Sequence, residues 1–292
     1  MRLLCLVTRR NIIPIHEYEQ LRKLSNKSSK WKKEQEVVTK QTIKDIHALS
    51  QKKHRDARRL FVAEGPKVVA DLLPLMECEC LYATSDFLSK QPPVLLQRVK
   101  QLEEVDAKTI DRLSLLCTPR DALALFRKPE TAPFDQLKQL PQKNLCLALD
   151  GVQDPGNMGT IVRIADWFGI EHIFASHATA DVFSPKVVQA TMGAVGRVQV
   201  HYLDLLQYIQ GLSVDVPVFG TFLDGDDMYN RELSRHGLIV MGNEGNGVTA
   251  EVSSLINHRL YIPPYPQGRA TSESLNVAVA TAIVCAEFRR RM

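Results

Sequence analysis

Apolar and polar positions follow two different periods along the second half of the chain. Short apolar runs of strand length recur from Leu145 onward, and stretches with helical apolar spacing separate them. The pattern predicts strands at 145–149, 172–175, 198–202, 218–222, 238–241 and 259–262 and helices at 157–168, 186–195, 203–209, 250–256 and 274–290. Strands that alternate with helices imply a parallel sheet with helices on both faces, so an α/β fold is expected.

The first half of the chain predicts a smaller α/β unit at residues 41–127. Its predicted elements are a helix through Ile43, Ile46 and Leu49, a strand at 60–63, a helix from Pro66, and strands at 80–83 and 122–126. Residues 128–143 contain three prolines and no strong period. We therefore expect a linker there, followed by the larger unit at 144–292.

Residues 1–40 differ from the rest in charge. They hold ten basic and four acidic side chains, which leaves 27 basic and 29 acidic side chains for the remainder, so the net charge of +4 comes from this segment. Such a polar, basic run is expected to be disordered or loosely helical. It is interpreted as an inert extension, with a phosphate-attracting arm and a mitochondrial presequence as the alternatives.

Composition excludes several classes of protein. Hydrophobic residues make up 45% and charged residues 24%, which is typical of a soluble globular chain, and no apolar run approaches the length of a membrane span. The six cysteines are scattered and none forms a C-x-x-C pair. A disulfide framework or a zinc site is therefore not expected, and a cytoplasmic location fits.

Ligands of parallel sheets bind beyond the carboxyl ends of the strands, which directs attention to three loops. In the first, Asn157 is expected to cap a helix whose free N–H groups form an anion site, and Arg163 follows one and a half turns later. A guanidinium presents a fork of donors that suits a phosphate. A capped helix with one solvated arginine is the alternative interpretation.

The second and third loops are rich in glycine and proline. Residues 242–247 form a G-x-x-G-x-G pattern, which is not the dinucleotide fingerprint and lacks the lysine of a P-loop. Residues 262–268 contain three prolines, after which Ser274 or Ser272 is expected to cap the last helix. The arginines at 289–291 are expected to be a solvated end of that helix, favourable to its dipole.

These three loops resemble the three motifs of the SpoU/TrmH family of RNA ribose 2′-O-methyltransferases in the SPOUT superfamily. The matching residues are Asn157, Gly159 and Arg163, then Gly242, Glu244, Gly245 and Gly247, and finally Ile262, Pro263, Ser274, Leu275 and Asn276. The unit around Arg59–Gly65 also resembles the ribosomal-protein-like (L30e-like) substrate-binding domain of many members. The likeness spans about residues 43–292.

The resemblance implies a deep trefoil knot, bound S-adenosylmethionine and no metal. It implies a homodimer in which Arg163 of one subunit completes the active site of the other. The catalytic residues that it implies are Arg163, Asn157, Glu244, Ser274 and Asn276. The cofactor-binding residues that it implies are Thr221, Phe222, Gly242, Asn243, Gly245, Ile262, Pro264 and Leu275. Family members often have methionine where this chain has Pro264, and the loop 264–271 is longer than in compact members.

In the implied reaction a ribose 2′-oxygen attacks the sulfonium methyl group. Arg163 is expected to lower the pKa of the hydroxyl or to clamp the adjacent phosphate, because its own pKa is too high for a base. Asn157 is expected to orient Arg163 or the ribose, and Glu244 to act as a base or to shape its loop. Ribosomal RNA is the favoured substrate. Transfer RNA, a non-catalytic RNA-binding assembly factor and a nicotinamide enzyme are the alternatives.

Overall fold

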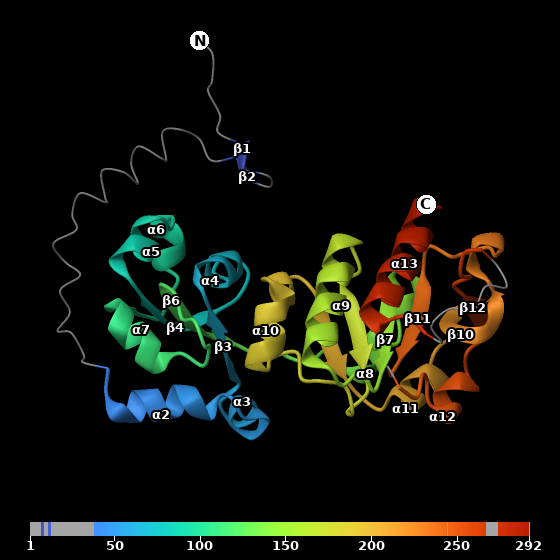
Figure 1. Ribbon diagram of the computed structural model, residues 1–292, viewed down its shortest axis with the longest axis horizontal. Coiled ribbons are helices and arrows are strands. Elements are labelled where there is room, and N and C mark those ends of the chain that lie inside the picture. The colour runs from blue at the N-terminus through green and yellow to red at the C-terminus, as the bar shows by residue number, and fades with distance from the viewer. Residues whose placement is uncertain (1–6, 9–10, 13–37, 244, 267–273, 292) are drawn as a thin grey trace, which may run out of the picture.

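The computed structural model describes residues 7–8, 11–12, 38–243, 245–266 and 274–291. The extension predicted at 1–40 lies almost entirely outside these residues, and within it β1 (Val7–Thr8) pairs antiparallel with β2 (Asn11–Ile12). The rest forms two units side by side (Figure 1), each built on its own sheet. We call residues 40–127 the N-terminal unit and residues 144–291 the C-terminal unit. In the described part of the chain, no helix has the length and apolarity needed to cross a membrane.

The C-terminal unit is a six-stranded, entirely parallel sheet in the order β12-β10-β11-β7-β8-β9, which confirms the predicted α/β class. Its strands are β7 (Leu145–Asp150), β8 (His172–Ala175), β9 (Gln199–Tyr202), β10 (Val218–Asp227), β11 (Gly237–Gly242) and β12 (His258–Tyr261). Its helices are α9 (Pro155–Trp167), α10 (Pro185–Thr191), α11 (Leu205–Gln210), α12 (Ala250–Ser253) and α13 (Val277–Arg290), with 3-10 turns η2 (Ala194–Gly196) and η3 (Met228–Asn230).

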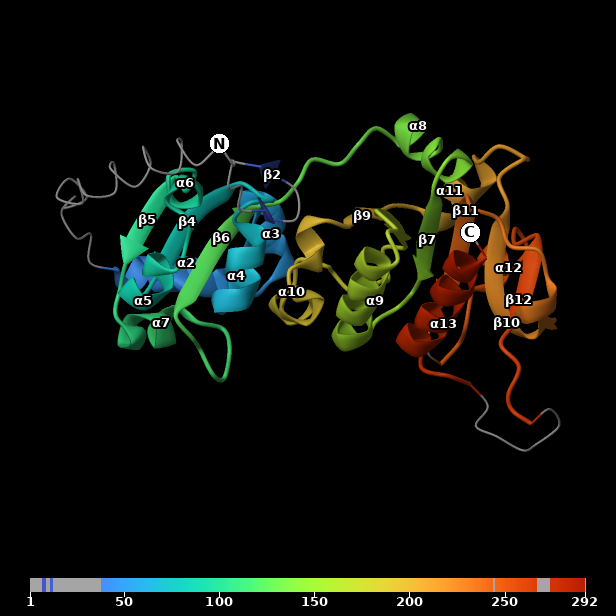
Figure 2. The same ribbon diagram turned by 90° about the horizontal axis from the view of Figure 1, so that it is seen from above.

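Helices cover both faces of this sheet because its strands are apolar on both sides. Along β7, Leu145, Leu147 and Leu149 pack against α9, α10 and α13, whereas Cys146 and Ala148 pack against α11 and α12. Figures 1 and 2 show these two layers. The trefoil knot remains a prediction.

The N-terminal unit is a four-stranded sheet in the order β3-β6-β4-β5, in which β6 runs antiparallel to its neighbours β3 and β4. Its elements are α2 (Lys40–Ala48), α3 (Lys52–Arg58), β3 (Leu60–Glu64), α4 (Pro66–Leu72), β4 (Cys78–Ala83), α5 (Ser85–Ser89), α6 (Pro93–Leu96), β5 (Gln101–Glu104), α7 (Ala107–Leu113) and β6 (Ala122–Arg127). The strand β5 was not predicted, because its residues QLEE are mostly exposed at the sheet edge and carry no apolar run.

The segment predicted as a linker, 128–143, is exposed over most of its length and has short helical turns only in its second half. It contains α8 (Phe134–Leu137) and a 3-10 turn η1 (Leu140–Gln142). Leu137 is buried among side chains of the C-terminal unit, and the hydroxyl of Tyr208 donates to its carbonyl oxygen at 3.0 Å. The second half of this segment is therefore anchored on the C-terminal unit.

Several predicted helix boundaries differ from the observed ones, including the helix expected at 250–256, which ends at Ser253. The helix expected at 186–195 ends at Thr191, because Met192 and Gly193 both adopt positive φ. The cap of α9 is Asp154, whose carboxylate accepts from the backbone N–H of Asn157, so Asn157 lies inside the first turn. Pro155 after an aspartate favours this earlier start.

The cap of α13 is also not the predicted serine. Asn276 occupies that place, and its side-chain oxygen accepts from the backbone N–H groups of Ala278 and Val279. Ser274 lies two residues before this cap and is exposed, and Ser272 lies outside the described residues. An asparagine caps as well as a serine does, so the geometry of the entering chain decides between them.

The arginines at 289–291 are not simply solvated. Arg289 donates to the carbonyl oxygens of Phe168 and Gly169, and Arg291 donates to those of Met228, Tyr229 and Arg231. Arg290 and Arg291 both bind the carboxylate of Glu287. These bonds hold the pKa of Glu287 down at about 2. The end of α13 is thereby fastened to the segments around it.

Candidate active site

The carboxyl ends of four adjacent strands bring the predicted loops together. Asp150 at the end of β7 pairs in register with Gly242 at the end of β11, and β10 and β12 continue the same edge. The first motif follows β7, the glycine loop follows β11, and the proline loop follows β12. The three motifs therefore meet at one edge of the sheet, as a parallel topology requires.

The glycine loop is a tight turn closed by its own backbone. Asn243 and Gly247 exchange two backbone hydrogen bonds, of 2.8 and 2.9 Å. The side-chain oxygen of Asn243 also accepts from the N–H groups of Gly245 and Asn246. A Cβ on Gly242 would lie 2.2 Å from the carbonyl carbon of Gly247, so only glycine permits this closure. Glu244, a predicted catalytic residue in the same loop, lies outside the described residues.

Asp150 and Thr249, neither of which was predicted from the sequence, hold the glycine loop against β7. The buried carboxylate of Asp150 accepts from both the backbone N–H and the hydroxyl of Thr249, each at 2.8 Å. The side-chain amide of Asn243 donates to the carbonyl oxygen of Gly151 at 2.8 Å. An acidic residue that ends an otherwise apolar strand was the available signal for Asp150. Asn243 was predicted to bind the cofactor, and its side chain forms hydrogen bonds that position the loop.

The first and third motifs meet through a pair of asparagines. The side-chain nitrogen of Asn276 donates to the side-chain oxygen of Asn157 at 3.0 Å, although 119 positions separate them. Ser274 and Leu275 precede this contact and are exposed, with 48% of Leu275 accessible. The structure thus joins Asn157 and Asn276, which were both predicted as catalytic residues.

Arg163 lies on the exposed side of α9 and forms no hydrogen bond or ion pair with any part of the chain that the structure describes. An exposed arginine without a partner retains all of its donors for another molecule. Trp167, four residues later on the same helix, is 85% exposed. Gly159 on the same helix is a packing residue, because a Cβ there would lie 2.4 Å from that of Ala190 on α10.

The strand β10 loops outward at the predicted cofactor residues. Thr221 and Asp226 both align with Leu260 of β12, so residues 222–225 protrude from the sheet as a bulge. The guanidinium carbon of Arg259 lies over the ring of Phe222, 3.5 Å from the ring centroid. Arg259 also binds Asp224 at 2.6 Å, which lowers the pKa of that carboxyl.

The proline loop begins on the core and ends outside the described residues. Ile262 packs against the main apolar cluster, and Pro264 is half-buried next to it. Most of the loop that we expected to be long, 264–271, lies outside the described residues from residue 267 onward. The part that is described places Ile262 and Pro264 at the same edge as the glycine loop.

Comparison with known proteins agrees with this geometry. Residues 144–286 match the model of the SpoU rRNA Methylase family, and residues 40–124 match the MRM3-like substrate binding domain. The 23S rRNA (guanosine(2553)-2'-O)-methyltransferase RlmP of Bacillus subtilis is 31% identical over 261 residues, which cover 88% of this chain and 99% of that protein. The chain belongs to the SpoU rRNA methylase family.

Solved structures of the SpoU/TrmH group have the same fold along almost their whole length. A TrmH-family protein from Porphyromonas gingivalis is 39% identical, with a TM-score of 0.75, and the alignment covers 88% of this chain and 100% of that one. An AdoMet-bound rRNA methyltransferase from Sinorhizobium meliloti is 32% identical, with a TM-score of 0.76 and coverages of 88% and 97%. Both units of this SpoU family member are thus shared with its relatives, as the sequence resemblance implied.

Proposed function

We propose that this protein is an S-adenosylmethionine-dependent methyltransferase that modifies a ribose 2′-hydroxyl of ribosomal RNA. The observation that carries the proposal is the contact between Asn157 and Asn276 beside the closed glycine loop. It joins the first and third motifs, and the bond from Asn243 to Gly151 holds the second motif at the same edge, where a parallel sheet binds its ligand. The relative that spans the whole of both units is named as a 23S rRNA enzyme, which favours ribosomal over transfer RNA.

The glycine loop fits a bound S-adenosylmethionine. Gly247 has positive φ, and no atom of the described residues lies within 4 Å of where its Cβ would be. For a Cβ on Gly245, the same residues place only the Asn243 side-chain oxygen nearby, at 3.5 Å. Bare backbone is therefore open for close approach of a ligand. With it we assign the neighbouring residues Thr221, Phe222, Gly242, Asn243, Ile262, Pro264 and Leu275 to the cofactor site.

When bound, the cofactor supplies a sulfonium methyl group, to which the ribose 2′-oxygen forms a bond as the carbon–sulfur bond breaks. Arg163 donates to the 2′-oxygen or to the adjacent phosphate, which stabilises the negative charge that develops as the hydroxyl loses its proton. Asn157 has its oxygen engaged by Asn276, so it is held in one rotamer and orients the ribose or Arg163. Glu244 accepts the proton or shapes the loop, and Ser274 completes the pocket.

The active site is shared between two copies of the chain. On α9, Arg163 and Trp167 face outward together, and on α13 the side chain of Val279 is 50% exposed. These two helices pack next to each other (Figure 2). We propose that a second copy covers these exposed side chains and receives Arg163 in its pocket. The domain division into 41–127, 128–143 and 144–292 and a cytoplasmic location are part of the same proposal.

The test compares Arg163→Ala with Arg235→Ala. Arg235 is an exposed arginine near the amino end of β11, away from the site, and it has no hydrogen bond or ion pair within the described residues. Calorimetric titration measures binding of S-adenosylmethionine, with NAD as the control, and transfer of labelled methyl groups to ribosomal RNA measures activity. Arg163→Ala is expected to bind the cofactor normally but to lose at least about a hundredfold in methylation.

Arg235→Ala is expected to match the unchanged protein in both assays. If the unchanged protein binds S-adenosylmethionine but methylates no RNA, the enzymatic proposal fails and a non-catalytic RNA-binding role replaces it. Binding of NAD alone overturns the cofactor assignment. Full activity of Arg163→Ala overturns the role of that residue while the enzymatic proposal stands.

A further inference from the structure

A buried ion pair joins the two units of the molecule. The Nη2 and Nε atoms of Arg55 on α3 lie 2.6 and 3.2 Å from one carboxylate oxygen of Asp181. Only 3% of the Arg55 side chain and 12% of the Asp181 side chain are exposed. The remaining Nη1 group of Arg55 donates to the carbonyl oxygens of Leu49 and Ser50, each at 2.8 Å. Arg55 therefore forms hydrogen bonds to residues of both the N-terminal unit and the C-terminal unit.

Asp181 is itself fixed in place. It lies in the loop 176–184 between β8 and α10, and its second carboxylate oxygen accepts from the N–H of Phe183. On either side of it, the hydroxyl of Tyr202 donates to the carbonyl oxygen of Ala180 and accepts from the N–H of Val182. Burial raises the pKa of Tyr202 far above its usual range, so it remains a neutral donor.

The contacts around the ion pair are closely packed. The rings of Phe61 and Phe183 lie 4.8 Å apart across the junction. The ammonium of Lys128 lies over the ring of Phe183 and binds Asp56 at 2.5 Å. Beyond it, η2 lies so close to α4 that a Cβ on Gly196 would be 2.8 Å from the Leu72 side chain. One apolar cluster runs through both units at this junction.

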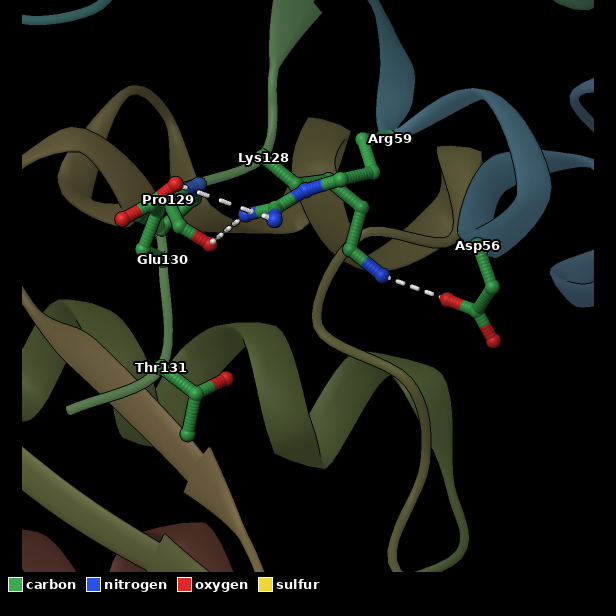
Figure 3. A pocket seen from close by; sticks show the side chains of 6 residues that line it. All are labelled: Asp56, Arg59, Lys128, Pro129, Glu130 and Thr131. Atoms are coloured by element: carbon green, nitrogen blue, oxygen red, sulfur yellow. Dashed lines mark hydrogen bonds and ion pairs between the residues drawn. The ribbon is translucent and has the colours of Figure 1, made fainter. Parts of the chain in front are cut away.

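The pocket in Figure 3 lies at the same junction and does not compete with the active site. It has a volume of about 520 Å³ and is lined by Asp56, Arg59, Lys128, Pro129, Glu130 and Thr131. Two cations and two anions face it, and Lys128 and Arg59 are engaged with Asp56 and Glu130. Its charges cancel, so it offers no net attraction to a phosphate.

The same loop that binds Arg55 also supports the glycine loop. The hydroxyl of Ser176 accepts from the N–H of Gly151, and the hydroxyl of Thr179 donates to the carbonyl oxygen of Leu149. Gly151 in turn accepts from Asn243 of the glycine loop. Consecutive hydrogen bonds and a short loop thus connect the ion pair to the candidate cofactor site.

We propose that Arg55 and Asp181 are positioning residues, which fix the N-terminal unit in one orientation so that RNA bound there presents its ribose to the glycine loop. The inference rests on the proposed function. A buried ion pair adds little net stability, because the loss of hydration offsets the attraction between the charges. Its strict geometry does define one arrangement of the partners, and catalysis is sensitive to small displacements of a bound substrate.

The test replaces the pair with apolar residues of similar size, as Arg55→Met with Asp181→Leu, so that no unpaired charge is buried. Its control is Arg58→Met with Asp45→Leu, which removes an ion pair of the same length, 2.6 Å, that is exposed and lies within the N-terminal unit. Arg55→Lys keeps the charge but not the fork of donors.

The apolar double variant is expected to fold, and to bind S-adenosylmethionine and RNA within about threefold of the unchanged protein. Its kcat is expected to fall at least about tenfold, and methyl groups are expected to appear on riboses next to the target. The kcat of Arg55→Lys is expected to lie between that of the apolar double variant and that of the unchanged protein. The control double variant is expected to behave as the unchanged protein. Unchanged kcat and unchanged target selectivity overturn the proposal.

Small-angle X-ray scattering keeps the inference separate from the proposed function. The unchanged protein is expected to fit one arrangement of its units, and the double variant a broader distribution of arrangements. If the unchanged protein methylates nothing, the proposed function fails, while a broadened distribution still supports the orienting role. A double variant as rigid as the unchanged protein overturns that role.

Discussion

The side-chain amide of Asn276 donates to the side-chain oxygen of Asn157 across 3.0 Å. This one bond ties the start of α13 to the first turn of α9. The same Asn276 caps its own helix through its side-chain oxygen, which accepts from Ala278 and Val279. Its two side-chain atoms therefore perform separable tasks, because the oxygen serves the fold and the nitrogen serves the candidate active site.

Substitutions at Asn276 separate the two tasks. Asn276→Asp keeps an oxygen for the cap but offers Asn157 a carboxylate in place of the amide donor, so we expect near-normal stability and a methylation rate at least about tenfold lower. Asn276→Ala loses both, and the missing cap costs a further ~1 kcal/mol of unfolding free energy. Chemical denaturation and a methylation assay on both variants check this. Normal activity of Asn276→Asp contradicts the role of the contact.

A second prediction concerns the two glycines at either side of Asn243. In Gly242→Ala the new methyl group would lie 2.2 Å from backbone atoms of the glycine loop, so the loop must open. We expect no measurable binding of S-adenosylmethionine and a lower melting temperature. Gly245→Ala is the matched control for folding, because within the described part of the chain its Cβ would meet only the Asn243 oxygen, at 3.5 Å.

Gly245→Ala is expected to melt as the unchanged protein does. Because Gly245 also belongs to the proposed cofactor site, weaker cofactor binding by this normally folded variant is expected. Calorimetric titration and thermal unfolding of both variants distinguish the two effects. A Gly242→Ala variant that binds the cofactor normally contradicts the importance of the closed turn.

The sequence predicts the sheet well because its strands are buried on both faces. Runs such as Leu145–Leu149 and Leu238–Met241 have no other stable environment, so their apolar character alone identifies them. The three loops follow from the same reasoning, because a parallel topology places them at one edge. The motif residues Asn157 and Asn276 could thus be expected to meet.

The parts that could not be predicted depend on partners distant in the chain. Arg55 lies in the sequence KKHRDAR, which is typical of a solvated helix, yet it is buried against Asp181, 126 positions away. Asp150 is the polar end of an apolar strand until Thr249 is placed beside it. In the same way, the choice of Asn276 over Ser274 as a cap depends on how the chain enters the helix.

The last prediction concerns pH and a pair of stacked histidines on β8 and β9. Nδ1 of His172 lies 3.2 Å from Nε2 of His201, and His201 is buried against Phe174. Burial lowers the pKa of both, that of His201 to about 4, with His172 as a further cause for His201. Between about pH 6.5 and pH 4 the unfolded chain therefore binds protons that the folded chain does not.

Folding stability is consequently expected to be full above about pH 6.5 and to fall as the pH drops toward 4, by up to about 1.4 kcal/mol per pH unit for His201. The variant His201→Gln removes this titration, so its loss of stability between pH 7 and pH 5 is expected to be smaller, although it is less stable at pH 7. Urea unfolding of both proteins at pH 7, 6 and 5 measures the difference. Equal pH dependence of the two proteins contradicts the prediction, because His201 would then titrate alike in the folded and unfolded states.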